Sequence, residues 1–288
     1  MDAFLHQVLS GLATGGIYAS VALALVMIYQ ATHHINFAQG EMAMFSTYLA
    51  WTLINAGLPY WIAFVLTIAL SFVAGIGIER VVIRPFRDAP VLTMVTVFIA
   101  LLVILNSVAG WIYSYTIKPF PSPFPKELGS VFMSPHEVGA IGVTLLVLVL
   151  VYLFFRHTPL GLAMRAAAQN PVSSRLAGIR VGWMLALGWG LAAAIGAVAG
   201  MMVAPIVYLD PNMMSGILLY AFAGALLGGI DNPWGAVLGG FIVGVLENVV
   251  GAYLIGTELK LSLALLLIVS VLIVKPSGLF GKLLVTRV

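Results

Sequence analysis

Long stretches with few or no charged residues alternate with short polar connections along the whole chain. A helix that spans a membrane needs about 20 consecutive, mostly apolar residues. The stretches that meet or approach this length are residues 4–29, 36–56, 60–83, 91–114, 138–155, 184–205, 216–230, 233–255 and 259–274. The last is short for a span, but Lys260 and Lys275 at its ends can snorkel to the two membrane surfaces. The pattern predicts an all-α fold, a polytopic membrane helical bundle of about eight or nine hydrophobic segments.

The composition is that of a protein whose surface faces lipid. Of the 288 residues, 62% are hydrophobic and 8% are charged, whereas about 25% are charged in a typical soluble domain. The net charge of +3 comes from scattered basic residues, which excludes a phosphate-tracking surface for nucleic acid. The chain has no cysteine, so disulfides, thiolate metal ligands and cysteine nucleophiles are excluded. The apolar run from Phe4 to Tyr29 is too long for a signal peptide, and we expect a retained first helix.

The hydrophobic stretch between residues 216 and 255 is interrupted by turn-forming and polar residues. The interruption contains Gly228, Gly229, Asp231, Asn232 and Pro233. A break inside a membrane needs protein or water partners for the freed backbone groups. The pattern therefore indicates either two closely packed helices or a re-entrant hairpin, and the sequence is compatible with both.

Two further patterns concern helix packing and symmetry. Glycines recur four residues apart, as at Gly11 and Gly15 or Gly196 and Gly200, and this spacing predicts closely packed helices. Residues 36–40 (Asn-Phe-Ala-Gln-Gly) and 232–235 (Asn-Pro-Trp-Gly) each follow a hydrophobic run and open a helix rich in small residues. Paired interruptions in the two halves of a chain are typical of a transport pathway.

The distribution of basic residues predicts the orientation in the membrane. Short loops rich in Lys and Arg face the cytoplasm. Three regions qualify: residues 156–183, with four arginines and no acidic residue, residues 79–90, and the C-terminus with Lys275, Lys282 and Arg287. The Pro-rich loop at about residues 115–137 and the loop around Asp210 would then lie outside the cytoplasm, and the side of Met1 is left open.

Ionisable or strongly polar residues inside spanning segments are costly and indicate function. Glu41 follows Asn36 and Gln39, so these three either face a translocation path or form a helix start that Asn36 caps. Glu247 and Asn248 either line a wet cavity, or Glu247 is paired across helices.

Other polar residues have simpler interpretations. We expect Asn106 to form an interhelical hydrogen bond, and Glu79, Arg80 and Arg84 to form a charge cluster at the membrane interface. His33 and His34 lie at a segment boundary, and without a His-x-x-x-His spacing a zinc site has no support.

The loop between residues 158 and 182 does not have the composition of a flexible linker. Residues 159–170 are rich in strong helix formers and predict a helix. Thr158-Pro159 marks its start, Asn170-Pro171 marks its end, and Arg165 lies near its middle. Pro171 can begin a second short helix that ends at Gly178. So many alanines favour a helix docked in the groove of another protein, although a helix lying on lipid headgroups is compatible too.

This loop carries a resemblance to a known family. The pattern Gly161-x-Ala163-x-Arg165-Ala166, followed by Asn170 and Gly178-Ile179, resembles the coupling loop of permease subunits of ABC importers. The form of the pattern is similar to that of permeases for branched-chain amino acids. Three further parts of the chain resemble the same family: residues 15–19 with 35–41, residues 229–240, and residues 275–281. The resemblance covers nearly the whole sequence.

The resemblance implies a permease subunit of an ATP-driven importer, not an enzyme, with residues 1–288 as a single transmembrane domain. A second permease subunit, expected to be a paralogue, two cytoplasmic ABC ATPases and an extracytoplasmic solute-binding protein would complete the transporter. The partner ATPases would bind ATP and Mg²⁺, because this chain has no Gly-x-x-x-x-Gly-Lys-Ser/Thr phosphate loop. The implied solute is a branched-chain or related amino acid. The implied location is the inner membrane of a bacterium, with a cytoplasmic C-terminus.

The resemblance also suggests roles for individual residues. The residues expected to couple to the ATPase are Gly161, Ala163, Arg165, Ala166, Asn170 and Gly178, and those expected in the pathway or its gate are Asn36, Gln39, Glu41, Glu247 and Asn248. The family often has His where this chain has Gln39, which forms hydrogen bonds but cannot titrate. It often has an acidic residue where this chain has Asn170, so one salt bridge to an ATPase is absent while docking remains feasible.

A second class of transporter explains part of the same pattern. An ion-coupled secondary transporter or channel also shows paired interruptions and buried carboxylates, but it does not need the helix at residues 159–170. An intramembrane enzyme is disfavoured, because the sequence has no His-Glu-x-x-His motif and no His deep in a segment to pair with a Ser. The loop at residues 158–182 is therefore the feature that separates the importer from the alternatives.

Overall fold

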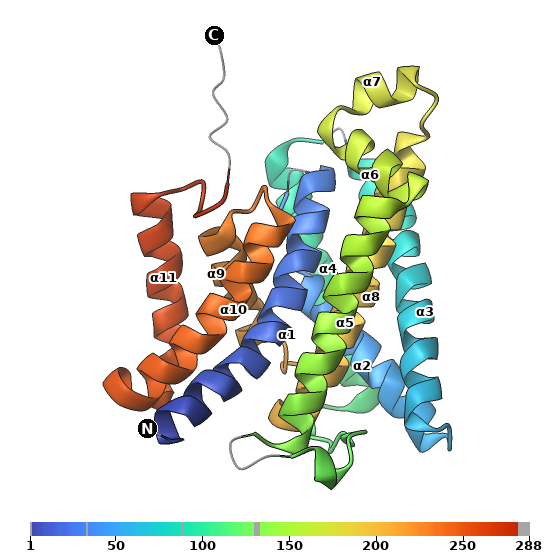
Figure 1. The fold of residues 1–288 in the computed structure, drawn as a ribbon. Helices are drawn as coiled ribbons and strands as arrows, with labels where there is room; N and C mark the ends of the chain where they lie inside the picture. Colours follow the sequence, from blue (N-terminus) through green and yellow to red (C-terminus); the bar gives the residue numbers. More distant parts are fainter. Residues whose placement is uncertain (1, 33, 88, 130–132, 282–288) are drawn as a thin grey trace. The chain divides into compact units, whose positions relative to one another are not determined.

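The computed structural model describes residues 2–32, 34–87, 89–129 and 133–281. The helices are α1 (Asp2–Thr32), α2 (Gln39–Asn55), α3 (Tyr60–Ile78), α4 (Val91–Tyr113), α5 (Pro135–His157), α6 (Pro159–Gln169), α7 (Pro171–Leu176), α8 (Val181–Val207), α9 (Ser215–Gly228), α10 (Pro233–Val250) and α11 (Lys260–Val274). In the described residues the only β pairing is an isolated bridge between Lys118 and Leu209. The predicted all-α fold is confirmed (Figure 1).

Each of the nine predicted hydrophobic segments coincides with one of these helices. Six of the described helical segments are long and apolar enough to cross a membrane. Their main parts are α1, α3, α4, α5, α8 and α10. The helices α9 and α11 are apolar but shorter. The protein is therefore a multi-pass membrane protein, and the total of eight or nine crossings stays a prediction.

The chain divides into two compact units. The first contains Met1–Val26, Phe124–Ile141 and Gly216–Val288, and the second contains Met27–Pro123 and Gly142–Ser215. Both α1 and α5 contribute to each unit.

The second unit is built around α8, which packs against α2 and α3. At the crossing with α2, a Cβ placed on Gly200 would lie 2.7 Å from the carbonyl oxygen of Ala43. Trp189 of α8 is fully buried and stacks on Phe98 of α4, with 6.0 Å between the ring centroids. The paired glycines of α8 therefore serve close helix packing, as their spacing predicts.

The first unit is held together by glycine contacts between α1, α9 and α10. A Cβ on Gly244 would lie 2.3 Å from the Cα of Gly15, and one on Gly239 would lie 2.0 Å from the carbonyl oxygen of Gly224. Only hydrogen at these positions allows the backbones to come so close. Helices in lipid associate mainly by such van der Waals contact, since lipid removes the hydrophobic drive between helices.

The break after α9 is a tight connection between two packed helices. Gly229 adopts a φ of +113°, and Asn232 caps α10 by accepting hydrogen bonds from the backbone N–H groups of Trp234 (3.1 Å) and Gly235 (3.2 Å). Residues 275–281 contact the break between α9 and α10. Leu279 N–H donates to Leu227 O (2.7 Å), and Phe280 N–H donates to Gly228 O (3.0 Å). At 14 residues α9 is about 21 Å long, which is shorter than the roughly 30 Å hydrocarbon core.

Candidate functional site

The second unit holds a polar cluster around Glu41, which is buried in the first turn of α2. The side-chain nitrogen of Asn106, on α4, lies 3.3 Å from Glu41 Oε2 and donates to it. The same nitrogen lies 2.8 Å from Pro211 O and 3.2 Å from Asn212 Oδ1, in the segment before α9. The predicted interhelical hydrogen bond of Asn106 is confirmed. Among the described residues no basic side chain forms an ion pair with Glu41. Burying a carboxylate without a cation is costly, so its presence in a membrane helix indicates a function.

The sequence neighbours of Glu41 have other partners. The expectation that Asn36 caps this helix is wrong, because the N-cap of α2 is Ala38 and Asn36 Oδ1 accepts from Ala38 N–H at 3.0 Å, before the helix begins. Gln39 is fully buried and donates through Nε2 to Ala192 O of α8 at 3.0 Å. Asn36 therefore holds the turn before α2, and Gln39 ties the start of α2 to α8. The hydrogen-bond partner of Glu41, Asn106, comes from a different helix.

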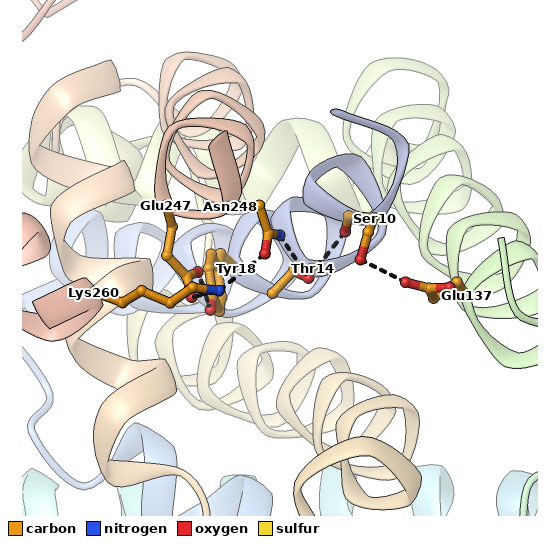
Figure 2. A network of polar contacts seen from close by, with 7 residues as sticks. All are labelled: Ser10, Thr14, Tyr18, Glu137, Glu247, Asn248 and Lys260. Atoms are coloured by element: carbon orange, nitrogen blue, oxygen red, sulfur yellow. Dashed lines mark hydrogen bonds and ion pairs between the residues drawn. The ribbon is translucent and has the colours of Figure 1, made fainter. Parts of the chain in front are cut away.

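In the first unit, Glu247 and Asn248 are paired across three helices (Figure 2). The hydroxyl of Tyr18, on α1, donates to Glu247 Oε2 at 2.6 Å, and Lys260 Nζ of α11 lies 3.4 Å from Glu247 Oε1. Lys260 Nζ also donates to Asn248 Oδ1 at 3.0 Å. Of the two alternatives for Glu247, the structure shows the interhelical pair. Lys260, which the sequence assigned to snorkelling, instead lies against α10 with its side chain 23% exposed.

The network continues along one face of α1 (Figure 2). Asn248 Nδ2 lies 3.5 Å from Thr14 Oγ1, and Ser10 Oγ donates to Glu137 Oε1 at 2.6 Å. Ser10, Thr14 and Tyr18 are four residues apart and therefore share a helix face. This face was not predicted from the sequence, although the regular spacing of its three hydroxyl side chains indicates it.

Replacing Lys260 by Met should destabilise the first unit, because it leaves the buried carboxylate of Glu247 without its cation. Removing one partner of a buried ion pair costs about 3–5 kcal/mol, and the partial exposure of Lys260 lowers the expected loss to about 2 kcal/mol. Thermal unfolding in detergent should show a lower Tm for Lys260→Met, partly restored by adding Glu247→Gln. Lys275→Met, at the other end of α11, is the matched control, and equal melting of the two single variants would contradict a stabilising pair.

The helix predicted for residues 159–170 is present as α6. Thr158 caps it, with its Oγ1 accepting from Gly161 N–H at 3.0 Å. Gly161, Met164 and Ala167 form its buried face, and a Cβ on Gly161 would lie 2.4 Å from Phe154 O. Arg165 lies on the exposed face, while Ala163 and Ala166 are half-buried.

The second short helix is also present, as α7, and it lies beyond the end of α5 (Figure 1). Asn170 caps it, accepting from Ser173 N–H at 2.9 Å, and Gly178 follows it with a φ of +81°. Val172 is 68% exposed and Leu176 is 86% exposed. These two apolar residues are four apart and form an uncovered face that the sequence analysis did not single out.

The charge cluster at the end of α3 is more extended than predicted. Glu79 pairs with Arg87 at 3.4 Å, and the guanidinium of Arg80 lies 3.4 Å from the ring centroid of Trp183. His33, Lys282 and Arg287 lie outside the described residues, and His34 bonds locally to Thr32. Within the described ranges no group of three or more metal-ligating side chains occurs.

Comparisons with known proteins cover nearly the whole chain. A family model described as the permease component of the branched-chain amino acid transport system matches residues 7–274. The chain is 31% identical to the high-affinity branched-chain amino acid transport system permease protein LivH of Escherichia coli K12, over 97% of this chain and 96% of that protein. It is also 31% identical to the permease protein BraD of Pseudomonas aeruginosa, with the same shares covered.

More distant proteins share the architecture. A protein of Methanocaldococcus jannaschii, named as a probable branched-chain amino acid transport permease protein, is 28% identical over 91% of this chain and 87% of its own length. Among solved structures, PsaBC from Streptococcus pneumoniae in complex with Fab matches with a TM-score of 0.51 and 13% identity, over 93% of this chain and 91% of that chain. The second likeness concerns the fold alone.

Proposed function

The chain belongs to the family of branched-chain amino acid transport system permease components, and from this premise we propose that it is a transmembrane subunit of an ATP-driven importer. The observation that carries the proposal is the match over nearly its full length to permeases at 31% identity. The solute is a branched-chain or related amino acid. The chain forms part of the path through the membrane and is itself no enzyme.

Energy comes from partner subunits in this proposal. The sequence has no phosphate-binding loop, so two ABC ATPases in the cytoplasm bind ATP and Mg²⁺. A second permease subunit, expected to be a paralogue, completes the pathway, and an extracytoplasmic binding protein delivers the solute. All of residues 1–288 then form one permease domain in a bacterial inner membrane. Its C-terminus and residues 156–183 lie in the cytoplasm, and the loop at 115–137 lies on the other side.

The coupling surface consists of the outward faces of α6 and α7. Arg165 is exposed on α6, and Val172 and Leu176 extend from α7 as an apolar pair. A charged side chain beside uncovered apolar residues is suited to a groove on another protein. Ala163, Ala166, Asn170 and Gly178 shape this surface, while Gly161 acts from the buried side by holding α6 against Phe154.

Movement of the ATPases reaches the membrane through α8. Met164 and Ala167 of α6 are buried, and α6 packs against α8, the central helix of its unit. A rigid helix packed along its length transmits displacement rather than absorbing it. Closure of the ATPase dimer thus moves α6 and α8 together and opens the path to one side at a time.

Glu41 is the strongest candidate for the pathway or its gate, together with Asn36 and Gln39. Its carboxylate is held by Asn106 without a basic partner among the described residues, which leaves it able to receive the ammonium group of an amino acid. Glu247 and Asn248 contribute to the gate through their pairing with Lys260. Glu41→Ala should reduce uptake while leaving the complex assembled, and unchanged uptake would remove Glu41 from the pathway.

Native mass spectrometry of the gently extracted, tagged chain tests the assembly, and uptake by proteoliposomes containing the same preparation tests the energy source. Two ATPase chains and a second permease in the complex, with uptake that requires ATP and binding protein, are the expected results. A homo-oligomer without an ATPase in several mild detergents, with uptake driven by an ion gradient, would instead establish an ion-coupled secondary transporter or channel.

A further inference from the structure

A basic pocket lies in the second unit, where α3 ends and α8 begins. Its volume is about 420 Å³, and none of the described residues that line it is acidic. The lining residues that matter here are Arg80, Arg84, Arg175, Arg180, Gly182 and Trp183. Four arginines thus line one open pocket, and Arg84, Arg175 and Arg180 among them are exposed. Arg175 belongs to α7, whose outward face is part of the coupling surface, whereas the other lining residues lie outside that surface and outside the proposed pathway.

Within this pocket, Arg80 is held in place by an aromatic ring that does not neutralise it. Arg80 lies over the ring of Trp183, with 3.4 Å between its guanidinium carbon and the ring centroid, and its buried Nε has no hydrogen-bond partner in the described structure. Arg84 Nη2 lies 3.7 Å from where a Cβ on Gly182 would be. The aromatic ring orients a cation but contributes no negative charge that would cancel it.

The nearby carboxylate does not balance these charges. Glu79 forms its ion pair with Arg87, at 3.4 Å, and also lies within electrostatic range of Arg80 and Arg84. One carboxylate therefore faces several guanidinium groups in the described part of the chain. Clustered like charges repel, and the planar donors of arginine match the oxygens of a phosphate. The chemistry of the pocket calls for an anionic ligand with a phosphate group.

The position of the pocket indicates where that phosphate comes from. The candidate spans Tyr60–Phe86 and Val181–Val207 both have one end at this pocket, so it lies at the level of the lipid headgroups. Trp183 is half-exposed there, and tryptophan is enriched at membrane interfaces. Basic pockets between membrane helices on the cytoplasmic side are typical sites for acidic headgroups.

An apolar strip on α3 continues from the pocket into the membrane. Leu66, Leu70 and Val73 of α3 are exposed, and their spacing of four and three residues places them on one helix face. Val81 is also exposed, in the π-helical turn Glu79–Ile83 that continues α3, and Arg84 begins the next turn. The strip is roughly 20 Å long, which exceeds the ~15 Å of one leaflet.

We propose that this pocket binds the phosphate of an anionic membrane phospholipid, with an acyl chain lying along the strip on α3. The headgroup would bridge the end of α3 and the connection from α7 to α8. In this way the lipid would stabilise the segment that connects α7 to α8. The site is independent of the transported solute and of the ATPases.

The test is a lipid titration of the full-length chain in detergent, followed by native mass spectrometry, with phosphatidylglycerol compared with phosphatidylethanolamine. The wild type should prefer phosphatidylglycerol. Each basic side chain near an acidic headgroup contributes an about fivefold factor in affinity, so Arg84→Gln with Arg180→Gln should weaken binding roughly 30-fold. The matched control is Arg156→Gln with Lys275→Gln, which removes two exposed basic side chains outside the pocket and outside the coupling surface and should keep the wild-type affinity.

Each of the other outcomes would overturn the proposal. Equal affinity of the pocket variant and the control variant would show that the arginines do not hold the lipid. Displacement of phosphatidylglycerol by millimolar inorganic phosphate would identify a site for a soluble anion. Unchanged lipid affinity together with loss of co-purifying ATPase would assign the pocket to protein docking. All four replaced side chains are exposed, so the fold should persist in both variants.

Discussion

Replacing Gly244 by Leu should strongly destabilise the first unit. A Cβ at this position would lie 2.3 Å from the Cα and 2.4 Å from the N of Gly15, and 2.6 Å from the carbonyl oxygen of Gly11. All three atoms belong to the backbone of α1, so no side-chain rotation can relieve the clash, and α1 must separate from α10. Overpacking a core costs about 1–3 kcal/mol when side chains can adjust, and more here. The expected result is a Tm lowered by at least about 10 °C, or no accumulation in the membrane.

The matched control is Gly142→Leu on α5. A Cβ at Gly142 meets no atom within 4 Å, so Leu at this exposed helix position should leave the protein as stable as the wild type. Thermal unfolding of both variants in the same detergent, together with their amounts in the membrane, is the measurement. Similar melting of Gly244→Leu and Gly142→Leu would contradict the close packing of α1 and α10.

The same glycines illustrate what the sequence reveals about this fold. The spacing of Gly196 and Gly200 predicts close packing because a helix places residues four apart on one face, and this periodicity is local. Helix ends are equally local, as the Thr158 cap of α6 shows. Elements and their packing faces could therefore be predicted, whereas the partner that each face meets could not.

The polar residues were harder to predict for the same reason. Glu247 and Lys260 lie 13 positions apart on different helices, and nothing in their local pattern pairs them. The sequence groups Glu41 with its neighbours Asn36 and Gln39, but its hydrogen bond comes from Asn106 of α4. The cap assigned to Asn36 fails because the chain makes one further turn before α2 begins. Pairings across helices depend on the packed structure, which a single sequence does not specify residue by residue.

Exposure on the short helices is a further property that only the structure supplies. Val172 and Leu176 are apolar and four residues apart, a spacing that predicts a buried helix face. In the structure both are uncovered, on a helix whose caps are satisfied. Exposed apolar patches mark contact sites with another protein or with a membrane, and the proposed coupling role takes the first of these.

The coupling surface therefore yields the second large effect. Arg165→Glu and, separately, Leu176→Asp should each lower ATP-driven uptake at least about tenfold, because central contacts of an interface carry most of its binding energy. Both side chains are exposed, so insertion and thermal stability should match those of the wild type. The measurements are uptake by proteoliposomes, Tm in detergent, and the amount of ATPase that co-purifies with each variant.

Arg156→Glu is the control for the change of charge, since Arg156 is exposed at the end of α5 and lies outside the α6–α7 surface. It should retain uptake and bound ATPase. Unchanged uptake in Arg165→Glu would remove Arg165 from the coupling contact. The two readouts also separate docking from transmission: loss of uptake together with the ATPase means that the side chain holds the partner. Loss of uptake with the ATPase still bound means that it passes the movement on to α8, which α6 contacts through its buried face.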